Sequence, residues 1–195
     1  MPLERVVAVK RPKQLFKSNI WNEAGKAGLI LGLTSSAYLF INNYLGTLSI
    51  NPFLMTFFSL ILRVTKITLC GFIMVALMKK FVNDNPKATN NDTRRLGTLT
   101  ALLSAFIFAG ISFADIAYIS PDLYAEQQKM VMDIYSQSLD NNMLAAIEKT
   151  MGYMPQYTFV TTLIYCFLYG SVLSAILSRN IPSRNPFADN KTEQN

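Results

Sequence analysis

Residues 53–78 read FLMTFFSLILRVTKITLCGFIMVALM, and this stretch decides the fold. A helix that crosses the hydrocarbon core of a bilayer needs about 20 predominantly apolar residues, and the stretch is long enough to supply them. It nevertheless carries two cations, Arg63 and Lys66, close to its centre. An isolated cation at mid-depth in a bilayer costs about 3 kcal/mol on insertion scales. The stretch therefore predicts a membrane-spanning helix whose two cations need a special environment.

Three further stretches, at residues 24–46, 96–119 and 157–179, have the same length and apolar character. Charged residues make up only 15% of the chain, well below the share that is typical of soluble domains. We therefore predict an all-α, polytopic membrane protein, with a bundle of four transmembrane helices in residues 24–179.

The Lys and Arg residues are distributed unevenly about the four spans. Fourteen of them lie in the N-terminal segment through Lys26, in the 79–95 connection or in the tail from Arg179, whereas the connections 47–52 and 120–156 hold two. Loops rich in Lys and Arg stay in the cytoplasm, so we predict that both termini are cytoplasmic. Because the basic residues flank the spans, we expect them to meet anionic lipids of the inner leaflet rather than nucleic acid.

The two ends of the chain differ in composition from the spans. Residues 1–23 form a basic segment that we place in the cytoplasm. Residues 180–195 contain few apolar side chains and two prolines, so we predict a disordered cytoplasmic tail.

The 120–156 connection is predicted to form two short amphipathic helices. Apolar residues recur near helical spacing on both sides of Asn141, and Gly152 with Pro155 is expected to end the second helix. We expect both helices to lie on the outer membrane face as an extracytoplasmic loop. The acids of this connection match no calcium-loop spacing, so we predict a solvated acidic face and no metal site.

Small residues recur at every fourth position in three of the four spans, which allows helix backbones to approach closely. The rows are Ala24, Gly28, Gly32 and Ser36; Gly97, Ala101, Ala105 and Ala109; and Cys166, Gly170, Ser174 and Ser178. Packing within one chain and dimerisation both remain open, and packing within the chain is the simpler interpretation. The second span has no such row, so we expect it to stand apart from the other three.

The two intramembrane cations share one face of the second span, because they lie three residues apart. Asp115, near the outer end of the third span, is offset from Arg63 by about 9 Å along the bundle. Three interpretations remain open: a structural polar cluster of Arg63, Lys66 and Asp115, an interior site for an anionic ligand, lipid head group or substrate, or contact with an acid of a partner protein. Lys66 has no expected acidic counterpart, so it is the strongest sign of a ligand or partner.

Residue types needed for common catalytic and metal sites are missing. The chain has no histidine, which removes histidine metal ligands and histidine general-base schemes. Cys70 and Cys166 lie inside apolar runs without CxxC spacing, so we expect them to pack as small apolar side chains. Ser59 precedes Arg63 by four positions, but a guanidinium cannot act as a base. We therefore predict no enzymatic activity, no cofactor and no metal site.

The run from VALMKKF (75–81) through RRLGTLTALLSAFIFAGISFADIAYISPDLYAEQQKMVMDIY (94–135) resembles a family of small bacterial membrane proteins. These proteins are common in Bacteroidetes and are catalogued as a domain of unknown function. The corresponding features are Gly97 near the start of the third span, the 124–137 stretch of the outer loop and Arg179 before the basic tail. The resemblance implies the same four-helix topology and carries no activity with it.

These observations lead us to expect a non-enzymatic multi-pass protein of the bacterial inner membrane. It would act through helix packing and through contacts with lipid, with further copies of itself or with another membrane protein. The alternative is a small transporter or channel-like component with an intramembrane anion site at Arg63 and Lys66.

Overall fold

The structure, a computed structural model, describes residues 12–48, 51–85, 88–136 and 140–181, and this part of the chain is helical throughout apart from short connections. The elements are α1 (Pro12–Gly46), α2 (Pro52–Asp84), α3 (Asn90–Ala114), the π-helical turn η1 (Asp115–Ile119), α4 (Pro121–Ser136), α5 (Asn141–Met151) and α6 (Met154–Asn180). Most of the predicted tail and the first residues of the basic segment lie outside the described residues.

Four helical segments are long and apolar enough to cross a membrane, as the sequence predicts. They are Ile20–Gly46, Phe53–Asp84, Asn90–Ile119 and Met154–Asn180. The chain is therefore an all-α protein with the composition of a multi-pass membrane protein. The second span begins where the sequence places it, with Pro52 in the first turn and the Asn51 side chain accepting the N–H of Phe53 at 3.0 Å.

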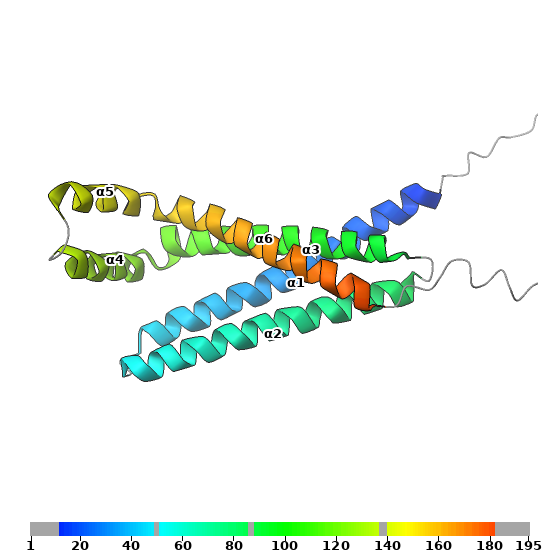
Figure 1. The fold of residues 1–195 in the computed structure, drawn as a ribbon, viewed down its shortest axis with the longest axis horizontal. Coiled ribbons are helices and arrows are strands. Elements are labelled where there is room, and N and C mark those ends of the chain that lie inside the picture. Colours follow the sequence, from blue (N-terminus) through cyan, green and yellow to red (C-terminus); the bar gives the residue numbers. More distant parts are fainter. Residues whose placement is uncertain (1–11, 49–50, 86–87, 137–139, 182–195) are drawn as a thin grey trace, which may run out of the picture.

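The four spans run alternately up and down the long axis of the molecule (Figure 1). α3 is the central helix, because it packs most extensively against α6 and then against α1. α2 packs mainly on α1 and touches α3 and α6 much less. In Figure 1 the α1–α2 pair diverges from the α3–α6 pair toward the end that carries α4 and α5. The second span therefore packs less extensively than the other three, and its main neighbour is α1.

The rows of small residues hold α1, α3 and α6 together. A Cβ atom at Gly28 of α1 would lie 2.7 Å from the Cβ of Leu103, and one at Gly170 of α6 would lie 2.5 Å from the Cβ of Ala101. Close approach also allows the Ser174 hydroxyl to donate a 2.9 Å hydrogen bond to the carbonyl of Arg94 across the α3–α6 contact. The rows therefore pack within this chain, as the simpler interpretation predicts, although Cys166 is only partly buried.

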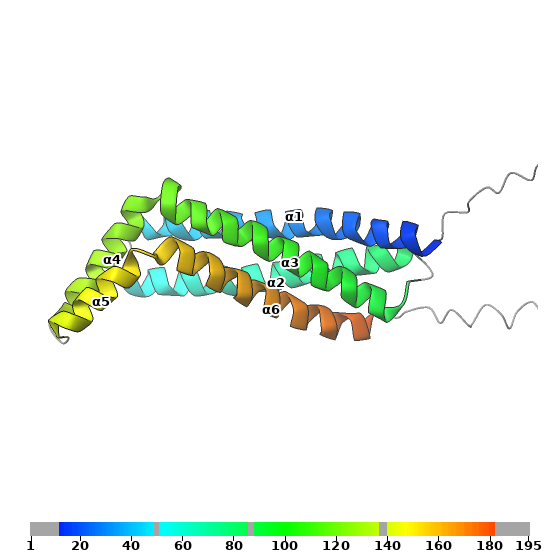
Figure 2. The same ribbon diagram turned by 90° about the horizontal axis from the view of Figure 1, so that it is seen from above.

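The connection between α3 and α6 contains two helices, α4 and α5, but they are not arranged as we expected. They form a hairpin that continues beyond the ends of α3 and α6 (Figure 1) and leans to one side of the bundle (Figure 2), instead of lying flat across its end. Amphipathic spacing predicts which side chains share a face, but it does not determine the direction in which a helix leaves the bundle.

Candidate functional site

The two intramembrane cations line one cavity between α1 and α2. The cavity measures about 210 Å³ and reaches the Phe108 ring of α3. Its lining residues are Tyr38, Leu39, Asn42, Ser59, Leu62, Arg63, Lys66 and Phe108. We call this space the cation cavity. None of the described residues that line it is an acid, so its fixed charge is positive.

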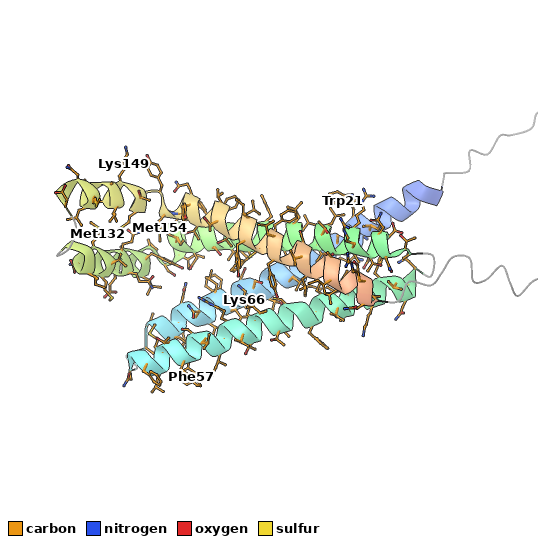
Figure 3. All side chains as sticks on the ribbon, in the orientation of Figure 1. Trp21, Phe57, Lys66, Met132, Lys149 and Met154 are labelled. Carbon is orange, nitrogen blue, oxygen red and sulfur yellow. The ribbon has the colours of Figure 1, made fainter. Side chains whose placement is uncertain are left out.

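Lys66 is held at this cavity by an aromatic ring. Its Nζ atom lies 4.0 Å from the centroid of the Phe108 ring, which is within the range of a cation–π interaction. Figure 3 shows Lys66 about halfway along the four-helix region, far from either end of the spans. The ring attracts the ammonium but does not neutralise its charge, so Lys66 keeps the capacity to bind an anion.

Arg63 lies one turn from Lys66 and is exposed at the side of the cavity. It forms no salt bridge or hydrogen bond with any residue in the part of the chain that the structure describes. A guanidinium offers five N–H donors in a planar fork that matches a carboxylate or a phosphate. Arg63 and Lys66 therefore present unused donors to the same space.

A second cavity adjoins the first at Lys66, toward the end of the bundle that carries the chain termini. It measures about 100 Å³ and draws its lining from all four spans. Apart from Lys66, the lining consists of Leu31, Ser35, Ile67, Cys70, Met74, Ala101, Ser104, Cys166, Tyr169, Gly170 and Leu173. We call this space the apolar cavity, since most of these side chains are hydrocarbon or thiol groups.

Asp115 lies apart from both cavities in a hydrogen-bond network of its own. Its carboxylate is fully buried and accepts the Asn43 amide at 2.6 Å, the Tyr124 hydroxyl at 2.8 Å and the Ser120 hydroxyl at 3.0 Å. The residue opens the π-helical turn η1, whose wide geometry brings the Ser120 N–H to the Asp115 carbonyl at 2.8 Å. Asp115 thus joins α1, α3 and α4 where the spans end.

This arrangement corrects one of the three interpretations of the intramembrane charges. The structure brings Arg63 and Lys66 together, but Asp115 is not part of their cluster, and no ion pair joins it to Arg63 within the described residues. The physical reason is that three neutral donors already satisfy the buried carboxylate. A cation on α2 is therefore not required to keep Asp115 in place.

Prediction from the sequence did not anticipate several residues of these two sites. Asn42 lines the cation cavity, and the amide of the adjacent Asn43 donates a hydrogen bond to Asp115. The Phe108 ring and the Tyr124 hydroxyl were not anticipated. Phe108 lies seven residues before Asp115 on a span antiparallel to α2, so a comparison of depths along the two helices would have brought it near Lys66.

Tyr124, on α4 outside the spans, has an altered acidity. Burial raises the pKa of its hydroxyl from 10.0 to about 12, and donation of the hydroxyl proton to Asp115 acts in the same direction. The neutral phenol is therefore the form that the folded protein stabilises at ordinary pH.

The polar side chains of the cation cavity can bind an anion. They are two cations, a phenol, an amide and a hydroxyl, and these residue types orient an anion by charge and hydrogen bonding. Among the described residues, no group of three or more His, Cys, Asp or Glu side chains is close enough to hold a metal ion.

Comparison with known proteins does not identify a relative. No family model matches the chain, and no curated protein or solved structure matches it. The likeness to the Bacteroidetes family stays a prediction.

Proposed function

We propose that this chain is a non-enzymatic, multi-pass membrane protein that binds an anionic group inside the bilayer, in the cation cavity. The observation that supports this function is that Arg63 and Lys66 line one cavity without an acid among its described lining residues. Asp115, the acid that the sequence offered as a partner for Arg63, accepts hydrogen bonds from three neutral donors instead.

The depth of the two cations strengthens the proposal. Cations within membrane spans are costly, and they are found mainly where they pair with another group or line a functional path. Snorkelling to the bilayer surface is least effective from the centre of a helix, where Lys66 lies. An anion between Arg63 and Lys66 would offset their cost and accept their unused donors.

We further propose that the protein lies in a bacterial inner membrane with both termini in the cytoplasm. The excess of Lys and Arg near the termini and in the 79–95 connection supports this orientation. The α4–α5 hairpin would then be extracytoplasmic. Basic residues beside the spans would meet anionic lipids, and contact with further copies or with another membrane protein remains compatible with this arrangement.

Binding of para-fluorobenzoate to the purified protein in lipid nanodiscs, followed by fluorine NMR, tests the proposed function. This anion is small enough for a cavity of about 210 Å³ and is soluble in both water and lipid. We expect saturable binding to the wild type and a loss of affinity of about tenfold or more in Lys66→Met and in Arg63→Gln, the loss typical of removing one charged hydrogen-bonding partner.

The matched controls are a neutral ligand and a distant lysine. The uncharged para-fluorobenzyl alcohol should bind no better to the wild type than to Lys66→Met. Lys79→Met removes a charge from the same helix outside the cavity and should bind para-fluorobenzoate as the wild type does. Equal affinity of the wild type and Lys66→Met for para-fluorobenzoate would overturn the proposed function.

A second candidate is a small transporter or channel-like component. Its support is that the cation cavity and the apolar cavity follow one another along the bundle and meet at Lys66. Uptake of radiolabelled benzoate into proteoliposomes distinguishes the two candidates. Uptake above that of protein-free liposomes, and lost in Lys66→Met, supports transport, whereas binding without uptake supports the first candidate alone.

A further inference from the structure

The two cavities that meet at Lys66 have opposite chemical character. The cation cavity offers a guanidinium, an ammonium, a phenol and an amide, whereas the apolar cavity is lined chiefly by hydrocarbon, thioether and thiol groups from the four spans. The Lys66 ammonium lies over Phe108, which lines only the cation cavity. The Lys66 ammonium thus lies at the junction of the two cavities, over Phe108 of the cation cavity and within electrostatic reach of the Cys70 and Cys166 thiols of the apolar cavity.

The position of the site restricts how an anion can reach it. Lys66 lies about halfway along the spans, and the side chains next to it on α2 are largely apolar and exposed, Val64 to 56% and Leu60 to 58%. A small anion in water would lose most of its hydration before it arrived at this depth. An anion that is attached to a hydrocarbon chain dissolves in the bilayer and can enter from the side.

We propose that the anionic group is the head of an amphiphile, a carboxylate or phosphate on an unbranched hydrocarbon chain. The head binds Arg63 and Lys66 in the cation cavity, and the chain carbons next to it occupy the apolar cavity. This inference rests on the proposed anion-binding function and adds the class of ligand.

The size of the apolar cavity predicts how the affinity depends on chain length. An apolar protein cavity of 150 Å³ accepts a benzene molecule, so a cavity of about 100 Å³ has room for roughly four carbon atoms. Affinity should therefore rise from acetate through butanoate to hexanoate and change little in octanoate. Because each methylene removed from water contributes about 0.8 kcal/mol, or about fourfold in affinity, the four methylenes that hexanoate has beyond acetate should raise the affinity by about 200-fold.

Competition with bound para-fluorobenzoate in nanodiscs measures this dependence directly. The two arms are alkyl carboxylates and alkyl phosphates of matched chain length, which separate a fatty-acid head from a phosphate head. Hexan-1-ol is the neutral control and should not compete. We expect at least one arm to show the rise with chain length and the plateau.

Variants of the apolar cavity provide the second readout. Cys166→Met and Cys70→Met each extend a side chain into this cavity and leave Arg63 and Lys66 unchanged. In each variant hexanoate should lose its advantage over acetate, whatever the affinity for para-fluorobenzoate, and an advantage equal to that in the wild type would contradict the amphiphile. Two such variants are used because either side chain alone can disturb folding, which thermal unfolding would report.

The outcomes separate this inference from the function on which it rests. If para-fluorobenzoate binding depends on Lys66 but acetate and hexanoate compete equally, the amphiphile is excluded and the anion-binding function stands. That result would favour a free anion or the carboxylate of a partner protein's helix. If para-fluorobenzoate binding does not depend on Lys66, both proposals fail together.

Discussion

Lys66 is the residue on which the account depends, because its charge has no acidic partner in the described part of the chain. A structural role and a binding role predict opposite effects of removing that charge. If the ammonium serves only to hold the helices together, its loss destabilises the fold. If the ammonium serves to bind a ligand, the ligand-free protein carries the free-energy cost of an unpaired cation in the membrane. A neutral side chain of similar length would remove that cost.

We therefore expect Lys66→Met to raise the free energy of unfolding of the ligand-free protein by about 1 kcal/mol, the insertion cost of the cation less the lost cation–π contact. Unfolding in mixed detergent measures the change. Lys79→Met, at an exposed position of the same helix, should leave stability unchanged. A clear loss of stability in Lys66→Met would support the structural interpretation of this residue instead.

Tyr124 predicts a dependence of stability on alkaline pH. Because burial and the hydrogen bond to Asp115 raise the pKa of its hydroxyl from 10.0 to about 12, the folded state binds this proton more tightly than the unfolded chain. Its contribution is therefore complete below pH 10 and is lost as the pH rises toward 12. The difference in unfolding free energy between the wild type and Tyr124→Phe should narrow over this interval. If the difference in unfolding free energy stayed constant over this interval, the raised pKa of Tyr124 would be contradicted.

At the scale of single residues, the sequence predicted that Arg63 and Lys66 lie together, but it did not predict the partners of Asp115. Arg63 and Lys66 stand out because charges are rare in apolar spans, and spacing alone places them on one face. The partners of Asp115 could not be found in this way, since Asn43 and Tyr124 come from α1 and α4. Whether these side chains come into contact depends on how each helix is rotated about its own axis. Polar residues near the end of a span do not determine that rotation.

At the scale of elements, close contact between α3 and α6 organises the bundle. Gly170→Ala would place a methyl group 2.5 Å from the Ala101 Cβ, so the two helices would have to separate. We expect a loss of about 1–3 kcal/mol, as for overpacked cores, measured by unfolding in mixed detergent. Gly110→Ala on α3 is the matched control, because nothing lies within 4 Å of a Cβ built there. Equal stability of the two variants would show that the contact is not tight.

The rows of small residues explain why this packing could be predicted from the sequence. Each row repeats with the helical period, so it selects one face of its helix, and a helix without a row cannot approach its neighbours as closely. That argument predicted the separation of α2. The direction of the α4–α5 hairpin had no comparable signal, because it is determined by η1 and the hydrogen bonds of Asp115.

At the scale of the whole molecule, the four crossings that we propose would place the two ends of the chain on the same side of a membrane. In a variant with Cys70 and Cys166 replaced by serine, we expect Asn180→Cys and Asn142→Cys to react with an impermeant thiol reagent from opposite sides, and Asn142→Cys from outside the cell. Both positions are exposed, so access does not limit the reaction. Labelling of both from one side would contradict the topology.

The central claim is that Arg63 and Lys66 bind an anion within the membrane, and its location is the most direct test. Anomalous X-ray diffraction from crystals grown with para-bromobenzoate reports the position of the bromine atom. We predict a peak in the cation cavity, with the carboxylate against Arg63 and Lys66 and the ring beside Phe108, and no such peak in crystals of Lys66→Met. Bromine found only elsewhere, or found in the same place without Lys66, would contradict the account.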